Sequence, residues 1–354
     1  MAILGLAHRL TGFAVSLWLL LLGATGSLLA LQEDWLPLVQ PAITGPLPGA
    51  GDESAAGLAR RVRAAEAGFG KDRVWALVLA GPSNALDQIY LRDQTGGGFL
   101  DPHSGAVIAR WRGNERFVDV LFELHRSLLL GQGAKKAVGI VGLAGLVLVL
   151  SGLVLAWPAI RRWRGAAWPR SATRAAMVVA HRELGLIVAL PLLVTMTTGV
   201  AVVFPATTKA LLRAVSGLPA PSASISKPVD AAADIAWQAV FTAALERFPD
   251  ASPRVVILPA APGSPIAVWL RQPAEWHPNG RTTVDATADG TVIQTRDAVA
   301  VPLTDRLVSE AYAVHAAKVG GPIYRFALAL TGLALALLAS YGAIAYARRL
   351  FGRR

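Results

Sequence analysis

The sequence predicts an α-helical membrane protein with four transmembrane helices in two pseudo-symmetric halves, plus two small α+β modules outside the membrane. Three observations predict this class: long apolar runs, arginines gathered at two places, and histidines and glycines that recur in both halves. Of the 354 residues, 54% are hydrophobic and only 16% are charged. Soluble domains average about 25% charged residues, so the composition itself favours a membrane protein.

Four apolar runs are long enough to span a bilayer, and they cover residues 3–31, 137–157, 175–204 and 323–347. A hydrocarbon core about 30 Å thick needs about 20 helical residues, and each run supplies them. The first run also has features of a signal peptide, with Arg9 as a short basic region. A near-copy of this segment begins at His181, inside the chain where no signal peptide can act. We therefore interpret the first run as a span.

The distribution of arginines predicts the orientation. Cytoplasmic segments carry an excess of basic residues, which places the segment between the second and third runs, and both termini, in the cytoplasm. The long loops at 32–136 and 205–322 are then on the opposite face. The net charge of +11 follows largely from these arginines, so we expect the lipid bilayer, and no nucleic acid, as a partner. The arginines concerned are Arg161, Arg162, Arg164, Arg170, Arg174, Arg348, Arg349, Arg353 and Arg354.

Each long loop predicts one α+β module. The first has a helical stretch at 54–67 and then the strand segments VWALVLA and IYLRD. The second has the helical stretch DAAADIAWQAVFTAALERFP and then RVVILPA and IAVWLRQ. Each module ends in a hairpin whose turn residues are Asp101-Pro102 and Ser104-Gly105 in the first and Asp289-Gly290 in the second.

Amphipathic segments at 116–130 and 304–318 lead from the modules into the second and fourth spans. They carry His125 and His315, and the glycines that follow should interrupt each helix before the span begins. We therefore expect helices on the outer membrane surface there. The predicted order is a first span (1–31), first module (32–115), interfacial helix with second span (116–160), cytoplasmic loop (161–174), third span (175–204), second module (205–303), and interfacial helix with fourth span and tail (304–354).

Four histidines occupy matching positions in the two halves. Their depths pair His8 with His181 on the cytoplasmic side and His125 with His315 on the outer side, across a two-fold axis along the membrane normal. Such paired imidazoles suggest two haem sites. The repeat matches His8-Arg9, Gly12 and Thr25-Gly26 with His181-Arg182, Gly185 and Thr198-Gly199, and it matches His125, Gly142 and Gly152 with His315, Gly332 and Gly342.

The absence of cysteine narrows the chemistry. It excludes disulfides, iron–sulfur clusters and covalently attached c-type haem, which leaves histidine as the only well-supplied ligand for a redox centre. A single histidine at a membrane edge is more often structural. Ionisable residues in spans are costly and tend to be functional, and four matched histidines favour ligation. His103 and His277 have no counterparts in the other half, so we interpret them as turn residues.

Three arginines directly follow predicted ligands: Arg9, Arg126 and Arg182. They are candidates to bind haem propionates, and contact with lipid phosphate is the alternative. Ala316 follows His315, so the pattern fails there.

Two glycines lie five helical turns after a predicted ligand, Gly26 after His8 and Gly199 after His181, and so share its helix face. They would let the second haem lie against the backbone. Ordinary packing of small residues between helices explains them equally well.

In combination these residues resemble the PepSY-associated transmembrane proteins, which include bacterial ferric-siderophore reductases of the inner membrane. The resemblance covers nearly the whole chain and implies two PepSY-like periplasmic modules, two haem b groups and electron transfer to the iron of a ferric siderophore. The chain has no flavin or nicotinamide domain, so a separate electron donor (quinol, flavin or reductase) is implied. The matching segments are HRLTG at His8, DPHSGAVIA at Asp101, LHRSLLLG at Leu124, HRELG at His181 and VHAAKVGG ending at Gly321.

Two function classes follow. The first is a haem-dependent ferric-siderophore reductase with both termini in the cytoplasm of a bacterium. The second is a non-catalytic regulatory or binding membrane protein, because PepSY-type domains elsewhere are thought to modulate partner proteins. A transporter is less supported, since no acidic or polar cluster lies at mid-bilayer. A haem absorption spectrum separates the first class from the others.

Overall fold

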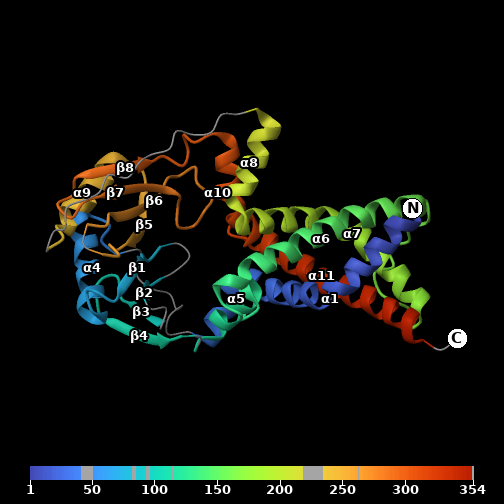
Figure 1. The fold of residues 1–354 in the computed structure, drawn as a ribbon. Helices are drawn as coiled ribbons and strands as arrows, with labels where there is room; N and C mark the ends of the chain where they lie inside the picture. Colours follow the sequence, from blue (N-terminus) through green and yellow to red (C-terminus); the bar gives the residue numbers. More distant parts are fainter. Residues whose placement is uncertain are drawn as a thin grey trace. The chain divides into compact units, whose positions relative to one another are not determined.

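The computed structural model describes residues 1–40, 51–81, 85–92, 96–113, 115–217, 234–261 and 263–352, without the side chain of Arg162. Arg353 and Arg354, which we expected in a cytoplasmic tail, lie outside the described residues. The chain divides into two compact units (Figure 1). The helical unit comprises Met1–Gln32, Val118–Leu211 and Ala311–Arg354, and the sheet unit comprises Glu33–Phe117 and Leu212–Glu310.

Four long helices form the helical unit: α1 (Ala2–Ala30), α6 (Lys135–Ala156), α7 (Arg174–Val203) and α11 (Gly321–Phe351). Short 3-10 turns, Gln132–Ala134 and Trp157–Arg162, flank α6. All four helices have the length and apolar composition needed to cross a membrane. The prediction of four spans is therefore confirmed in number and position.

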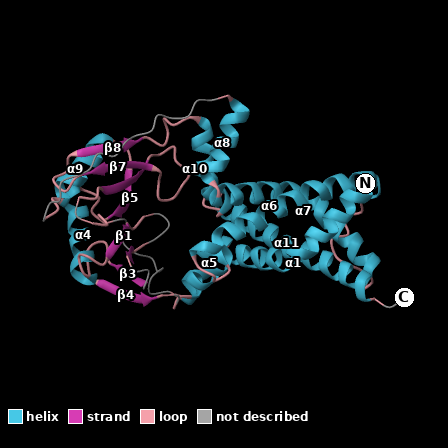
Figure 2. Ribbon diagram, viewed as in Figure 1, coloured by secondary structure: helices cyan, strands magenta, loops and turns pink. Residues whose placement is uncertain are grey.

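The four helices pack as a bundle in which α1 contacts α6 and α11, and α7 contacts the same two helices (Figure 2). The backbones of α1 and α11 approach closely at Gly23 and Gly332, where a Cβ added to Gly23 would lie 2.5 Å from the Gly332 carbonyl oxygen. Small residues permit this kind of close helix contact in membranes. Leu19, Leu192, Met196 and other apolar side chains fill the space between the helices.

The sheet unit contains eight antiparallel strands in the order β4-β3-β2-β1-β5-β6-β7-β8. Two helices, α4 (Ala55–Phe69) and α9 (Trp237–Arg247), belong to this unit and pack against each other. The strands are β1 (Val74–Val78), β2 (Asp87–Leu91), β3 (Gly96–Leu100), β4 (Val107–Arg112), β5 (Ser252–Ile257), β6 (Ile266–Arg271), β7 (Thr282–Ala286) and β8 (Val292–Arg296).

The two predicted modules are therefore one continuous sheet, which corrects our expectation of two separate bodies. Each contributes a helix and four strands, as predicted, but β1 pairs with β5, with Ala76 opposite Ile257 and Val78 opposite Val255. One hydrophobic core, which includes Leu58 from α4 and Phe241 from α9, serves both halves. The physical reason is that an unpaired edge strand exposes backbone donors and acceptors, and joining β1 to β5 removes two such edges.

Four shorter helices precede or follow the long helices along the chain. α5 (Phe117–Ser127) and α10 (Leu303–His315) match the predicted amphipathic segments. α5 ends at Ser127 and α10 at His315, each before residues with positive φ: Leu128 (55°), Leu129 (61°) and Ala317 (52°). Gly131 (φ 78°) and Gly320 (φ 74°) then directly precede the next helical segment. Both helices are therefore interrupted before the span, as predicted, although they end before the glycines. α2 (Gln32–Val39) and α8 (Pro205–Ser216), which continue the chain beyond α1 and α7, were not predicted.

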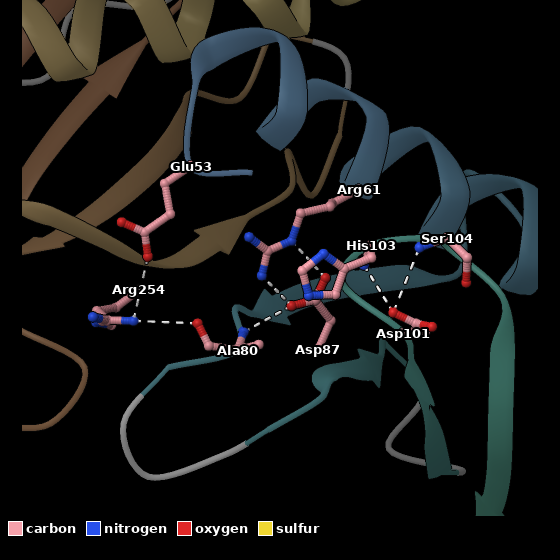
Figure 3. A network of polar contacts seen from close by, with 8 residues as sticks. All are labelled: Glu53, Arg61, Ala80, Asp87, Asp101, His103, Ser104 and Arg254. Carbon is pink, nitrogen blue, oxygen red and sulfur yellow. Dashed lines mark hydrogen bonds and ion pairs between the residues drawn. The ribbon is translucent and has the colours of Figure 1, made fainter. Parts of the chain in front are cut away.

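A buried ion pair joins α4 to β2 inside the sheet unit (Figure 3). The Arg61 guanidinium contacts both carboxylate oxygens of Asp87, and the two side chains are only 3% and 1% exposed. Asp87 also accepts a hydrogen bond from the Ala80 amide at 2.7 Å, while Arg254 donates to the Ala80 carbonyl at 3.2 Å. Asp87 of β2 thus connects α4 with the residues that follow β1, and Arg254 of β5 joins this network through the Ala80 carbonyl.

Candidate functional site

The four repeated histidines lie in two facing pairs within the helical unit. His8 on α1 faces His181 on α7, with ring centroids 6.3 Å apart and ring planes at 83°. His125 on α5 faces His315 on α10, with centroids 6.2 Å apart and planes at 41°. Each pair joins one histidine from each half of the sequence, in the combination predicted from their depths.

The two histidines of the first half each use Nδ1 to bind a side-chain hydroxyl. His8 Nδ1 lies 2.8 Å from Ser151 Oγ, and His125 Nδ1 lies 2.9 Å from Thr25 Oγ1. Both hydroxyls already donate to a backbone carbonyl, Ser151 to Leu148 at 3.1 Å and Thr25 to Leu21 at 2.7 Å. Because a hydroxyl has one proton, which each of these hydroxyls gives to its carbonyl, we assign the imidazole hydrogen to Nδ1, from which the hydroxyl accepts.

The two histidines of the second half use Nδ1 to bind backbone carbonyls directly. His181 Nδ1 is 2.9 Å from the Leu338 oxygen, and His315 Nδ1 is 3.0 Å from the Thr195 oxygen. A carbonyl only accepts, so these nitrogens also carry the hydrogen. All four rings therefore have the tautomer whose Nε2 lone pair is available to a metal, with the other nitrogen fixed by a hydrogen bond, as is usual for metal-binding histidines.

A glycine lies against each imidazole. A Cβ added to Gly199 or Gly26 would be 2.8 Å or 3.0 Å from Cε1 of His315 or His125, respectively. Cβ atoms added to Gly152 and Gly342 would be 3.3 Å and 3.5 Å from Cε1 of His8 and His181. The repeated glycines thus make room for the imidazole rings. We did not predict this contact from the sequence, where we considered a haem face or helix packing for Gly26 and Gly199.

A cavity of about 420 Å³ opens beside His8 and His181. Its walls are largely apolar and come from all four long helices, and its size is within the range of small-molecule and cofactor sites, about 300–1,000 Å³. Four arginines line it: Arg9, Arg174, Arg182 and Arg349. The arrangement combines two imidazoles, an apolar interior and cationic groups able to bind carboxylates.

The three arginines predicted as propionate partners have different surroundings. Arg9 and Arg182 line the cavity, and Arg182 also donates to Glu183 Oε1 at 2.6 Å. Arg126 instead pairs with the Glu123 carboxylate on its own helix. Arg9 and Arg182 therefore line the cavity beside the inner pair, whereas Arg126 is not among the residues that line it.

A family comparison covers this entire region. The model of the family described as PepSY-associated TM region matches residues 6–349, nearly the whole chain, including all four histidines and their glycines. The chain belongs to the PepSY-associated TM family. No curated protein matches the chain. In this PepSY-associated protein the histidine pairs, the cavity and the arginines all lie within the matched residues.

Several residues that contact the histidines of the PepSY-associated protein were not predicted from the sequence, although the sequence contains a pattern that marks them. A hydroxyl residue precedes each of the four glycines that contact a ring, and two of them, Ser151 and Thr25, bind the first-half histidines. The other two are Thr198 and Tyr341. Thr198 Oγ1 is 3.4 Å from His315 Nδ1, whereas the Tyr341 hydroxyl is buried and has no hydrogen-bond partner among the described residues.

Glu183 is a further residue that sequence reasoning missed. Its side chain is 1% exposed and accepts hydrogen bonds from the Arg164 amide at 2.7 Å and the Gly165 amide at 3.0 Å, in addition to Arg182. Glu183 therefore fixes the segment between α6 and α7 beside the inner histidine pair. The first half of the chain has no equivalent carboxylate, because Leu10 occupies the corresponding position.

The two unrepeated histidines lie in the sheet unit. His103 is exposed in the turn between β3 and β4, where its amide donates to Asp101 at 2.8 Å, as predicted (Figure 3). His277 is also in a turn, but it is only 4% exposed, and its Nδ1 accepts from the Asn279 amide at 3.1 Å. Burial, together with Arg281 and Arg271, lowers the pKa of His277 to about 3. His277 is thus a neutral, buried structural residue.

Proposed function

We propose that the chain is a di-haem oxidoreductase of the bacterial inner membrane that passes electrons across the bilayer and reduces the iron of ferric siderophores in the periplasm. The observation that supports this most directly is the set of four histidines. They form two facing pairs, and in every ring Nδ1 donates a hydrogen bond and leaves Nε2 for a metal.

The separation of the rings fits two imidazoles on one metal ion. A metal–imidazole bond is about 2.0–2.1 Å long and the ring centre lies about 1.1 Å behind the bonding nitrogen, so two axial rings have centres about 6.3 Å apart. The observed separations are 6.3 Å and 6.2 Å. Ordinary ring contacts in this protein have similar separations, 6.0 Å for Tyr90–Trp111 and 6.2 Å for Trp237–Phe241, so the spacing is compatible with a shared metal ion and the histidine pairing carries the argument.

The residues around the inner pair suit haem b in particular. The apolar cavity would contain the macrocycle, and Arg9 and Arg182, with Arg174 or Arg349, would bind its propionate carboxylates. A bound haem supplies a one-electron Fe(III)/Fe(II) couple, and two histidine ligands leave no coordination position for oxygen. His125 and His315 would hold the second haem through their imidazoles.

The chain's own residues would hold two redox centres at opposite ends of the bundle, which divides the bilayer into short electron-transfer steps. A separate quinol or reduced flavin would release two electrons and two protons, and two ferric siderophore complexes would each take one electron and become ferrous. Siderophore oxygens hold Fe(II) far less tightly than Fe(III), so iron is released without covalent change to the siderophore. Both chain termini would then be cytoplasmic, in accordance with the arginine distribution.

The test begins with the purified, detergent-solubilised protein reconstituted with haem. A pyridine haemochrome assay should give two non-covalent haems per chain. The dithionite-reduced protein, freed from excess reductant, should then be reoxidised by ferric hydroxamate or catecholate complexes, with ferrous iron trapped by a chelator in equal amount. His315→Ala should lose this reaction, whereas His103→Ala, a change at an exposed turn, should keep it.

Two results would contradict the proposal. Protein that binds no haem after full reconstitution would favour the non-catalytic alternative. If the protein binds two haems but stays reduced in the presence of both siderophore classes, the electron path would still be supported, but the ferric-reductase role would be wrong.

A further inference from the structure

The two members of each histidine pair are held by different chemical groups. In the inner pair His8 binds the Ser151 hydroxyl, whereas His181 binds the Leu338 carbonyl. Leu338 corresponds in the repeat to Leu148, which is the residue whose carbonyl accepts from Ser151. The first half therefore inserts a hydroxyl between the imidazole and the carbonyl that the second half uses directly.

The outer pair repeats this difference. His125 binds the Thr25 hydroxyl at 2.9 Å, whereas His315 binds the Thr195 carbonyl at 3.0 Å and has Thr198 only as a more distant contact at 3.4 Å. The carbonyl of Leu22, which corresponds to Thr195, also interacts with His125. Thr25 and Thr198 thus occupy equivalent positions but differ in importance to their histidines.

We infer that Ser151 and Thr25 are positioning residues that would set the tautomer and ring orientation of one histidine ligand in each haem site, while Tyr341 has no such role and Thr198 has a lesser one. This inference rests on the proposed function. A hydrogen bond from Nδ1 makes the imidazole a stronger electron donor and so stabilises Fe(III). Loss of the acceptor weakens that donation and frees the ring to rotate.

The inner site provides the sharper test because Ser151 has a matched control. Ser151→Ala should raise the reduction potential of the inner haem, alter its low-spin electron paramagnetic resonance signal, and reduce haem affinity by about 10–100-fold, as is typical for the partner of a metal-binding histidine. Tyr341→Phe removes a buried hydroxyl that has no hydrogen-bond partner, so it should leave all three quantities unchanged. Ser151→Thr keeps a hydroxyl and should restore wild-type behaviour.

The outer site gives an independent comparison. Thr25→Val should raise the potential of the outer haem, by less than Ser151→Ala raises that of the inner one, because the Leu22 carbonyl is available to His125. Thr198→Val should have a smaller effect than Thr25→Val, because His315 keeps the Thr195 carbonyl at 3.0 Å and its contact with Thr198 is longer, at 3.4 Å. If Ser151→Ala destabilises the whole protein, the Thr25 and Thr198 variants decide the question.

The outcomes separate this inference from the function on which it rests. Wild-type protein without haem would overturn both. Wild-type protein with two haems, together with Ser151→Ala and Thr25→Val variants that match their controls in potential, affinity and resonance signal, would overturn the positioning role alone. Equal effects at Thr25 and Thr198 would show that the two halves hold their ligands in the same way and would also contradict it.

Discussion

The imidazole of His315 lies against Gly199, so closely that a Cβ atom at Gly199 would be 2.8 Å from Cε1 of the ring. Real Cβ atoms do not come this near, and the ring could not keep its position beside any other residue. The same relationship recurs at the other three histidines with increasing distance, up to 3.5 Å between Gly342 and His181. The four imidazole rings can therefore be ranked by their distance from the glycine beside each, with His315 the closest and His181 the most distant.

This ranking predicts a graded response to alanine. Gly199→Ala should displace His315 and abolish haem binding at the outer site, because the added methyl overlaps the ring. Gly342→Ala places its methyl at ordinary contact distance from His181 and should retain the inner haem. Haem content and the difference spectrum of each purified variant measure this.

Two results would contradict this prediction. If Gly199→Ala binds the outer haem normally, the ring has more freedom than the contact distance allows, and His315 would not be a tightly held ligand. Equal loss in both variants would mean that helix packing, and not contact with the ring, explains the glycines.

The histidine pairs should be separable by mutation and by spectroscopy. His125→Ala should remove the outer haem and leave the inner one, and His8→Ala should do the reverse, because the ligands of each site come from different helices. The inner rings are nearly perpendicular, at 83°, and the outer rings are at 41°. Near-perpendicular ligand planes keep the iron orbitals close in energy, so the inner haem should give the more anisotropic low-spin resonance signal.

His8→Ala should therefore abolish the more anisotropic signal and His125→Ala the less anisotropic one. His103→Ala should change neither. Loss of both signals in each single variant, with the protein still folded, would contradict the assignment of two independent sites.

The spans and the pairing of the histidines were predictable because their signals are local or repeated. About twenty apolar residues suffice to identify a span, and the spacing from His8 to Gly26 recurs from His181 to Gly199. The repeat then pairs residues by depth without any knowledge of side-chain contacts. The hydroxyl before each ring-contacting glycine was also visible, but only the structure distinguishes Ser151, which binds a histidine, from Tyr341, which does not.

The single sheet was not predictable in this way. Strands within each half are joined by short connections, and their alternating patterns identify them. The pairing of Ala76 with Ile257 joins residues far apart in the sequence, and nothing local in either strand specifies its partner. The Arg61–Asp87 ion pair likewise depends on how α4 packs over β2.

That ion pair predicts a large loss of stability on mutation. Arg61→Ala leaves the Asp87 carboxylate buried without its cation, which typically costs about 3–5 kcal/mol. The neighbouring Arg60 provides a matched control, because it pairs with Asp52 through side chains that are 62% and 45% exposed, and such pairs contribute less than about 1 kcal/mol. Urea unfolding followed by tryptophan fluorescence should show a much larger decrease for Arg61→Ala. Equal decreases for the two variants would contradict the buried pair.

Buried His277 predicts a loss of stability in acid. Its pKa is about 3 in the folded protein and about 6.5 when unfolded, so the unfolded state binds more protons between these values. The contribution is fully present above pH 6.5 and is lost as the pH falls towards 3. The His277→Asn variant keeps an acceptor for the Asn279 amide but cannot titrate. Its thermal midpoint should fall less than that of the wild type between pH 7.5 and 5, and parallel curves would show that His277 does not titrate as expected.

The arginine distribution predicts the orientation of the chain. The segment between α6 and α7 and the end of α11 carry exposed arginines, among them Arg161, Arg164 and Arg349, and in both segments the described residues contain no exposed carboxylate side chain. Retention of basic segments in the cytoplasm then places Trp168 inside and Gly97 of the sheet unit in the periplasm. Alkaline phosphatase, which is active only in the periplasm, should therefore be active when fused after Gly97 and inactive when fused after Trp168. A cytoplasm-specific reporter should give the opposite pattern.

Phosphatase activity from the Trp168 fusion would show that the orientation is the reverse of the one predicted. In that case His8 and His181 would lie at the periplasmic end, and the sheet unit would be on the side of the electron donor.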